Sequence, residues 1–101
     1  MKYGLKETTI EQICSVFSSF PEIQKVVLYG SRAKGNFKNG SDIDLTFYGN
    51  NLDLKTLNKI EDQLEDLSLP YQFDLSIFDQ ISNKDLAEHI KRVGIIIYQN
   101  P

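Results

Sequence analysis

The sequence predicts an α/β (α+β) domain in which helices flank a small mixed β-sheet. Stretches with helical spacing of apolar residues alternate along the chain with short apolar or alternating runs that are typical of strands. No internal repeat and no Pro/Ser-rich linker interrupts this alternation. Because 101 residues suffice for one modest core, we expect residues 1–101 to form a single domain.

The first expected element is an amphipathic helix, bounded by Thr8 and Thr9 before it and by Pro21 after it. Its apolar residues recur mostly at three- and four-residue steps, as on one face of a helix. These residues are Leu5, Ile10, Ile13, Phe17 and Phe20. The single cysteine, Cys14, lies on or beside this face, so we interpret it as part of the core.

A strand and a short helix are expected next. Residues 25–29 form a continuous apolar run that stops at Gly30, which indicates a central strand buried on both faces. Ser31 is a candidate cap for a short helix that Gly35 would end. The polar residues 36–40 that follow predict a loop.

The middle of the chain predicts a half-buried strand and a long helix. Residues 42–47 alternate polar and apolar side chains, so Ile43, Leu45 and Phe47 should face the core. A helix that ends before Pro70 follows the turn after this strand. Its expected apolar face consists of Leu54, Leu57, Ile60, Leu64 and Leu67.

The C-terminal third predicts a strand, a helix and a last short strand. Residues 72–78 alternate again, which places Asp74 on the face opposite the apolar side chains. Ser82 and Asn83 are candidate caps for the helix, and Gly94 would close it. The apolar run 95–98 completes the sheet.

Charge and hydropathy exclude several classes of protein. The net charge of −3 lacks the basic surplus of domains that bind a nucleic-acid backbone, so a nucleic-acid substrate is disfavoured. No apolar run approaches the roughly 20 residues that cross a bilayer. The N-terminus turns polar after Leu5, without the apolar stretch of a secretory signal. We therefore expect a cytoplasmic protein with no membrane partner.

Two aspartates at the start of the 42–47 strand suggest a metal site. Asp42 and Asp44 are two residues apart, so both carboxylates leave the same face, about 7 Å apart. Carboxylate oxygens are the ligands that Mg²⁺ prefers, and Mg²⁺ usually takes further ligands from substrate phosphates. The pair therefore predicts a nucleoside triphosphate as partner.

A possible phosphate site lies just before this pair. Gly30 and Ser31 end a strand and open a helix, where free backbone N–H groups can bind phosphate. Arg32, Lys34 and Lys38 follow within eight residues and could offset the charge of a triphosphate. An alternative for Lys34 and Lys38 is that they are ordinary loop charges, and this interpretation is favoured for Lys38, which lies in a polar stretch.

These segments together resemble the signature of the DNA polymerase β-like nucleotidyltransferase superfamily. The resemblance is carried by residues 28–35 (LYGSRAKG) and 41–45 (SDIDL). Within the superfamily the chain is similar to the minimal nucleotidyltransferases (MNT), since residues 71–75 (YQFDL) resemble their third-carboxylate strand and residues 90–98 their closing helix and strand. Nearly the whole chain is covered.

The resemblance implies the fold of that superfamily and a site with two Mg²⁺ ions and ATP as nucleotidyl donor. The implied metal ligands and catalytic residues are Asp42, Asp44 and Asp74, with Asp74 as the base for the incoming hydroxyl. The residues implied to bind the nucleotide are Gly30, Ser31 and Arg32. An alternative for Asp74 is a polar residue on the open face of an edge strand, and Arg32 could instead fix a nearby carboxylate.

The resemblance also implies a partner. Minimal nucleotidyltransferases are commonly the antitoxins of HEPN-type helical toxins, and some transfer AMP onto a tyrosine of the toxin. We therefore expect AMP transfer to a hydroxyl of such a protein, with the acceptor site completed by the partner or by a second copy of this chain. Two alternatives remain open: a module that neutralises a toxin by binding alone, and nucleotidyl transfer to a small molecule. His89 stands alone in the last expected helix without a metal-ligand companion, so we interpret it as a surface residue and assign it no role.

Overall fold

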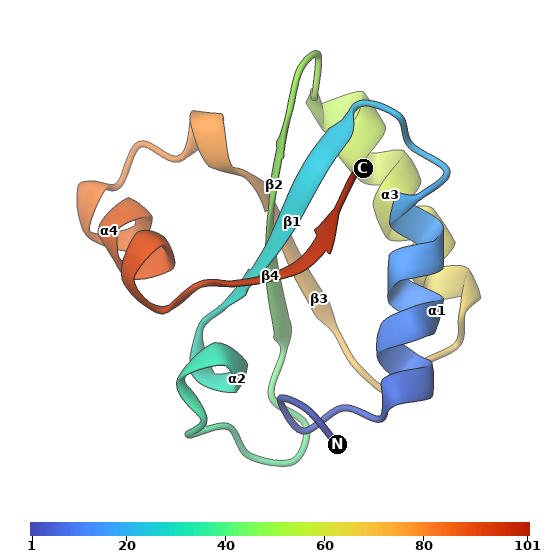
Figure 1. The fold of residues 1–101 in the computed structure, drawn as a ribbon, viewed down its shortest axis with the longest axis vertical. Coiled ribbons are helices and arrows are strands. Elements are labelled where there is room, and N and C mark those ends of the chain that lie inside the picture. The colour runs from blue at the N-terminus through green and yellow to red at the C-terminus, as the bar shows by residue number, and fades with distance from the viewer.

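The computed structural model describes all 101 residues, and helices lie on both faces of a four-stranded sheet (Figure 1). The strands are β1 (Ile23–Tyr29), β2 (Ile43–Gly49), β3 (Phe73–Ile77) and β4 (Ile95–Gln99). The helices are α1 (Glu7–Phe17), α2 (Ser31–Lys34), α3 (Leu54–Asp66) and α4 (Lys84–Val93), with a 3₁₀ turn, η1 (Phe78–Gln80), after β3. The predicted order of helices and strands is confirmed, and only η1 was not expected.

The sheet is mixed, as predicted, and its strand order is β3-β2-β1-β4. β1 pairs antiparallel with both β2 and β4, whereas β2 and β3 are parallel and are joined through α3. β1 and β2 are therefore the two central strands, and β3 and β4 form the edges. The expectation that residues 25–29 form a central strand is confirmed.

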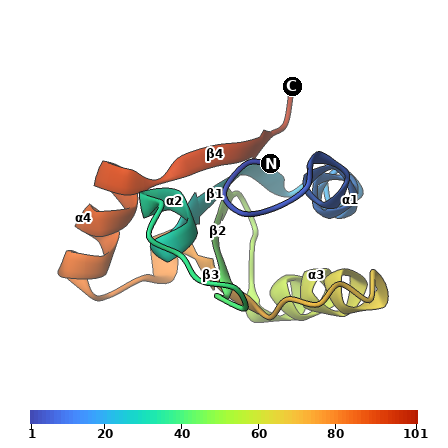
Figure 2. The ribbon, with the colours of Figure 1, turned by 90° about the horizontal axis from the view of Figure 1, so that it is seen from below.

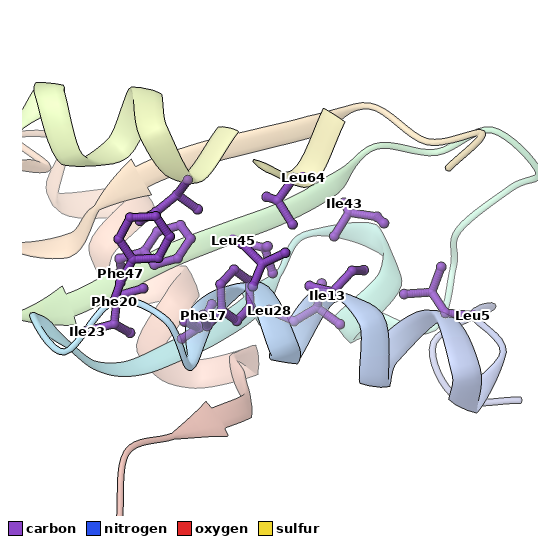
Figure 3. Close-up of a cluster of buried hydrophobic side chains, with 13 residues drawn as sticks. Leu5, Ile13, Phe17, Phe20, Ile23, Leu28, Ile43, Leu45, Phe47 and Leu64 are labelled. Carbon is purple, nitrogen blue, oxygen red and sulfur yellow. The ribbon is translucent and has the colours of Figure 1, made fainter. Parts of the chain in front are cut away.

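The main core fills the space between one face of the sheet and helices α1 and α3, which lie on the same side (Figures 1 and 2). Figure 3 shows these side chains converging from both helices and from β1 and β2. Ile43, Leu45 and Phe47 point into this core and are at most 1% exposed, which confirms the alternation predicted for β2. On the other face only Val27, Tyr29 and Ile90 form a small buried cluster beneath α4.

Two predicted helix starts are wrong. Helix α1 begins at Glu7 without a side-chain cap, so Thr8 and Thr9 lie inside the helix and do not bound it. The helix starts early because Leu5, held by a backbone bridge to Lys2, is already anchored in the core. Helix α2 is preceded by Gly30 as its N-cap residue, which has no side chain to cap with.

The predicted apolar face of α3 is wrong at one position, because Leu54 is 68% exposed. In a helix, side chains three residues apart point in directions that differ by about 60°. Leu54 and Ile60 are two such steps apart, so their directions differ by about twice this angle. Because Ile60 is fully buried, Leu54 points away from the core. Asp53 caps this helix by accepting from the backbone N–H of Thr56 at 2.8 Å. None of the helices combines the length and the apolar character needed to cross a membrane.

Candidate functional site

Three aspartates lie at one end of the sheet, on the face opposite the main core. In the register of the sheet Asp44 of β2 is the direct neighbour of Asp74 of β3, and Asp42 precedes Asp44 by two residues. Side chains of opposed residues on adjacent strands leave the same face. We call Asp42, Asp44 and Asp74 the acidic row. The sheet thus brings together all three aspartates that the sequence predicted as a group.

The acidic row concentrates negative charge around its middle member. Burial, then the charge of Asp74 and then that of Asp42 raise the pKa of Asp44 to about 6, while the charge of Arg32 acts in the opposite direction. Asp42 and Asp74 are exposed, whereas Asp44 is partly buried. Repulsion among carboxylates at one place is relieved by a cation, and hard oxygen donors of this kind suit Mg²⁺.

The side chains are not, however, arranged as a finished metal centre. The structure contains no group of three or more His, Cys, Asp or Glu side chains positioned to hold one ion. The chemistry of the donor set fits a divalent cation, but a site with three protein ligands would need carboxylates to rotate toward one another. The assignment of all three aspartates as metal ligands stays a prediction.

Gly30 joins β1 to α2 directly against the acidic row. Its φ of 75° lies in the left-handed region that favours glycine. A Cβ atom at this position would overlap Oδ2 of Asp44, so a side chain here would displace that carboxylate. Only a residue without a side chain lets the turn close over Asp44.

Ser31 is the first residue of α2 at the same turn, one position after the predicted cap position, and is half-buried. Because α2 is a single turn of four residues, its macrodipole is small, and the backbone N–H groups at its start are the donors that matter. They lie next to Gly30 and hence beside Asp44. A phosphate at this turn would therefore be close to the acidic row.

Arg32 is placed differently from what the sequence suggested. Its side chain is 2% exposed. Its guanidinium donates two hydrogen bonds to the Ser41 carbonyl, at 2.8 and 3.2 Å, and one to the Tyr3 carbonyl at 2.9 Å. It also lies over the rings of Phe37 and Tyr71. Arg32 therefore ties the N-terminal turn to the residue before Asp42, and a contact with a triphosphate would require it to leave these partners.

The acidic row lies on open surface. The molecule has four surface pockets, and none of them is lined by an aspartate of the row. Lys34 and Lys38 are exposed near the same end of the sheet. A larger substrate would therefore meet the aspartates on a surface with no preformed cavity for an acceptor group.

Sequence reasoning missed two aromatic residues beside the row. Tyr29 of β1 is the register neighbour of Asp44 and is 7% exposed. His89, expected at the surface without a role, is half-buried and packs edge-on against the Tyr29 ring at 6.3 Å between centroids. The position of Tyr29 directly before Gly30 was the available signal, but only the β1–β2 register shows that it faces an aspartate.

Comparison with known proteins places this arrangement in a family. The family model described as polymerase beta, nucleotidyltransferase matches residues 11–101. No curated protein matches the chain significantly in sequence.

Several solved structures share the fold. A chain of a toxin–antitoxin complex crystallised with AMP-PNP superposes with a TM-score of 0.72 at 22% identity, covering 95% of this chain and 75% of that chain. A chain of the complex between tri-AMPylated HEPN toxin and MNT antitoxin from Shewanella oneidensis gives 0.70 at 17% identity, with coverage of 95% and 74%. A candidate nucleotidyltransferase from Sulfolobus solfataricus gives 0.55 at 19% identity, with coverage of 96% and 92%. The predicted fold is thus confirmed.

Proposed function

This chain belongs to the polymerase beta nucleotidyltransferase family, and we propose that it transfers AMP from ATP, with Mg²⁺, to a hydroxyl group of a HEPN-type partner protein and thereby acts as an antitoxin. The observation that carries the proposal is the acidic row beside the Gly30 turn. It combines carboxylates that favour a divalent cation with backbone donors that favour phosphate. A Mg–nucleotide complex is the ligand that needs both.

In the proposed site Asp42, Asp44 and Asp74 hold Mg²⁺, and the Gly30–Ser31 turn receives the triphosphate. Bound Mg²⁺ would neutralise charge on the phosphates and on the leaving group. The acceptor oxygen forms a bond to the α-phosphorus as the bond from that phosphorus to the pyrophosphate oxygen breaks, and pyrophosphate leaves. The hydroxyl proton passes to Asp74, whose exposed carboxylate on edge strand β3 is open to an incoming protein.

A protein acceptor suits the open surface. No pocket adjoins the aspartates that could enclose a small acceptor, so the remaining walls of the site must come from another molecule. The structural neighbours include a complex between a modified HEPN toxin and an MNT antitoxin. That neighbour supports a helical HEPN-type protein as partner over a small molecule.

The experiment is intact-mass spectrometry of the neighbouring gene product after incubation with this protein, ATP and Mg²⁺. We expect a gain of one or more AMP units. Asp42→Asn and Asp44→Asn should each lower the rate on the order of a thousandfold, because each removes a charge that holds the metal. No gain in mass with a stable complex still formed would contradict the enzyme and favour a module that neutralises its partner by binding.

A pair of glycine variants tests the geometry of the turn. Gly30 and Gly35 both have a positive φ, of 75° and 88°, but Gly30 has a ψ of −155°, in a region nearly restricted to glycine, whereas Gly35 has a ψ of 4° and is left-handed. Alanine therefore strains the backbone more at Gly30. Only at Gly30 does the new Cβ meet the Asp44 carboxylate, whereas Gly35 faces open space. We expect Gly30→Ala to abolish AMP transfer and Gly35→Ala to retain it. Equal activity of the two variants would contradict the proposed closeness of phosphate and metal.

A further inference from the structure

The outer edge of β3 is open to a further strand. β3 is an edge strand, and the elements that mainly pack against it are β2 and α3. In Figure 2 it lies at the far side of the sheet from β4, with α3 to one side and α4 to the other. An edge strand keeps a row of N–H and C=O groups that another chain can pair with.

The register shows which backbone groups of β3 face outward. The Ile43 N–H donates to the Gln72 carbonyl at 2.9 Å, so the backbone groups of Gln72 face β2. Those of Asp74, two residues later, face β2 as well, because the direction alternates along a strand. The N–H and C=O groups of Phe73 and Leu75 therefore point outward. A segment paired with them would hold one of its residues directly opposite Asp74.

A pocket lies beside the same edge, on the face of the sheet that carries the main core. It has a volume of about 250 Å³, and Leu69, Tyr71 and Phe73 form apolar walls. Glu61 and Glu65 of α3 line it with exposed side chains, and no basic residue lines it. We call it the α3 pocket. Its lining fits a cationic side chain with an apolar stem, as in lysine or arginine.

An added strand would present side chains to both sites at once. Successive side chains of a strand point to opposite faces, and opposed residues on neighbouring strands share a face. The residue opposite Asp74 would point toward the acidic row. The residue next to it would point toward the α3 pocket, because Phe73 and Leu75 pack on that side, against the main core.

We propose that the acceptor protein binds through an extended segment that pairs with the outer edge of β3, with its acceptor hydroxyl opposite Asp74 and an adjacent lysine or arginine in the α3 pocket. The inference rests on the proposed function for the identity of the occupant as an acceptor. Charge complementarity favours a basic segment over a second copy of this chain, because two copies would bring their acidic edges together and each has a net charge of −3. Backbone pairing gives affinity, and the pocket gives a preference for the basic neighbour.

The test measures the binding of fluorescein-labelled peptides to this protein by fluorescence polarisation. Each peptide has one central tyrosine flanked on both sides by lysine, alanine or glutamate and is otherwise identical. We expect the lysine peptide to bind about tenfold more tightly than the alanine peptide, as two exposed charge pairs would provide, and the glutamate peptide to bind most weakly. No binding of the lysine peptide, or equal binding of all three, would overturn the proposal.

Charge reversal in the α3 pocket, by Glu61→Lys with Glu65→Lys, should reverse this order of affinities. The matched control is Asp62→Lys with Asp66→Lys, which makes the same change in charge on α3 at exposed residues that do not line the pocket. The control should still prefer the lysine peptide, and circular dichroism verifies that both variants are folded. Equal loss of the preference in both variants would assign it to overall charge and overturn the proposal.

Hydrogen exchange followed by NMR tests the strand pairing. Saturation with the lysine peptide should slow exchange at the Phe73 and Leu75 amides about tenfold or more, because their N–H groups gain partners. Unchanged exchange at both amides would overturn the proposal. Protection that appears without peptide and grows with protein concentration would do so too, because a second copy would then occupy the edge.

Intact-mass measurement after incubation with ATP and Mg²⁺ separates this inference from the proposed function. Preferential binding at β3 with no AMP on the peptide or on the neighbouring gene product would refute the proposed function but not the docking surface. AMP transfer to the neighbouring gene product by a protein with no preference for the lysine peptide would refute the docking surface alone.

Discussion

The face of the sheet that packs against α1 and α3 and the face that carries α4 differ in what their side chains contribute. The first holds a cluster of 13 buried apolar residues. On the second face only Val27, Tyr29 and Ile90 form a buried apolar cluster, and next to them lies the acidic row. Apolar burial provides most of the free energy of folding, whereas clustered carboxylates oppose it. The chain therefore separates the residues that stabilise the fold from those that bind the proposed ligand, one group on each face.

The largest expected effect is on the apolar face. Phe17 is fully buried and packs edge-on against Phe47 at 5.3 Å and Tyr98 at 5.8 Å between ring centroids. Phe17→Ala should lower the free energy of unfolding by about 3–5 kcal/mol, because it removes apolar burial and leaves a cavity. Urea unfolding followed by circular dichroism measures this change.

Leu54→Ala is the control, since Leu54 is a large apolar residue that is 68% exposed. It should change the free energy of unfolding by less than about 0.5 kcal/mol. Similar losses for the two variants would contradict a core confined to one face. Folded Phe17→Ala protein should keep its AMP transfer per molecule, because no atom of Phe17 reaches the acidic row.

A smaller effect is expected at Arg32, a buried residue that both stabilises the fold and contacts the residue before the acidic row. Arg32→Met keeps much of the side-chain volume but leaves the carbonyls of Tyr3 and Ser41 without their donor. We expect the free energy of unfolding to fall by about 1–3 kcal/mol. AMP transfer should fall as well, since Ser41 precedes Asp42. Unfolding curves and initial rates at one temperature measure both quantities.

Lys34→Met provides the matched control, because Lys34 lies two residues away in α2 and is exposed. It should leave stability within about 0.5 kcal/mol of wild type. If Arg32→Met lost AMP transfer with unchanged stability, Arg32 would be a direct ligand of the nucleotide, as the sequence first suggested. Loss of both would agree with the observed hydrogen bonds.

Local patterns in the sequence predicted the face of each aspartate but not its neighbours. Residues 43–47 and 73–77 alternate strictly, and alternation alone fixes which side chains point away from the core. The two strands had to be parallel neighbours in register for Asp44 to meet Asp74, and no local pattern encodes that pairing. The similarity of the surrounding segments to a known signature supplied the missing long-range information.

Contacts between distant segments account for what could not be predicted. Arg32 donates to the Tyr3 carbonyl, 29 residues away in sequence. The sequence motif around Gly30 does not indicate this contact, so the charge of Arg32 was assigned to the ligand. His89 was interpreted as a surface residue because it stands alone in the last helix without a metal-ligand companion, but helix packing turns its ring toward Tyr29. The environment of both residues depends on tertiary packing.

The smallest expected effect is a pH dependence that arises from the acidic face alone. The pKa of Asp44 is raised from 3.8 to about 6 in the folded protein. An acid with a raised pKa holds its proton more tightly when folded, so stability is lost as the pH rises through this window. Asp44→Asn lacks this loss and should therefore be more stable than wild type above pH 6, by about 1 kcal/mol after allowance for solvent screening. Below pH 4 the two proteins should be equally stable.

Denaturant unfolding at pH 4, 5, 6 and 7 in the presence of EDTA measures this difference. Repeating the series with Mg²⁺ then separates a destabilising acidic row from a metal site. A cation that binds only the folded state stabilises it by RT ln(1 + [L]/Kd), where [L] is its free concentration and Kd its dissociation constant. Mg²⁺ should therefore restore wild type near pH 7 and leave Asp44→Asn unchanged. If Mg²⁺ stabilised both proteins equally, the repulsion at Asp44 would have no connection with a bound cation. The acidic row would then lower the stability of the fold, and no bound ligand would offset this loss.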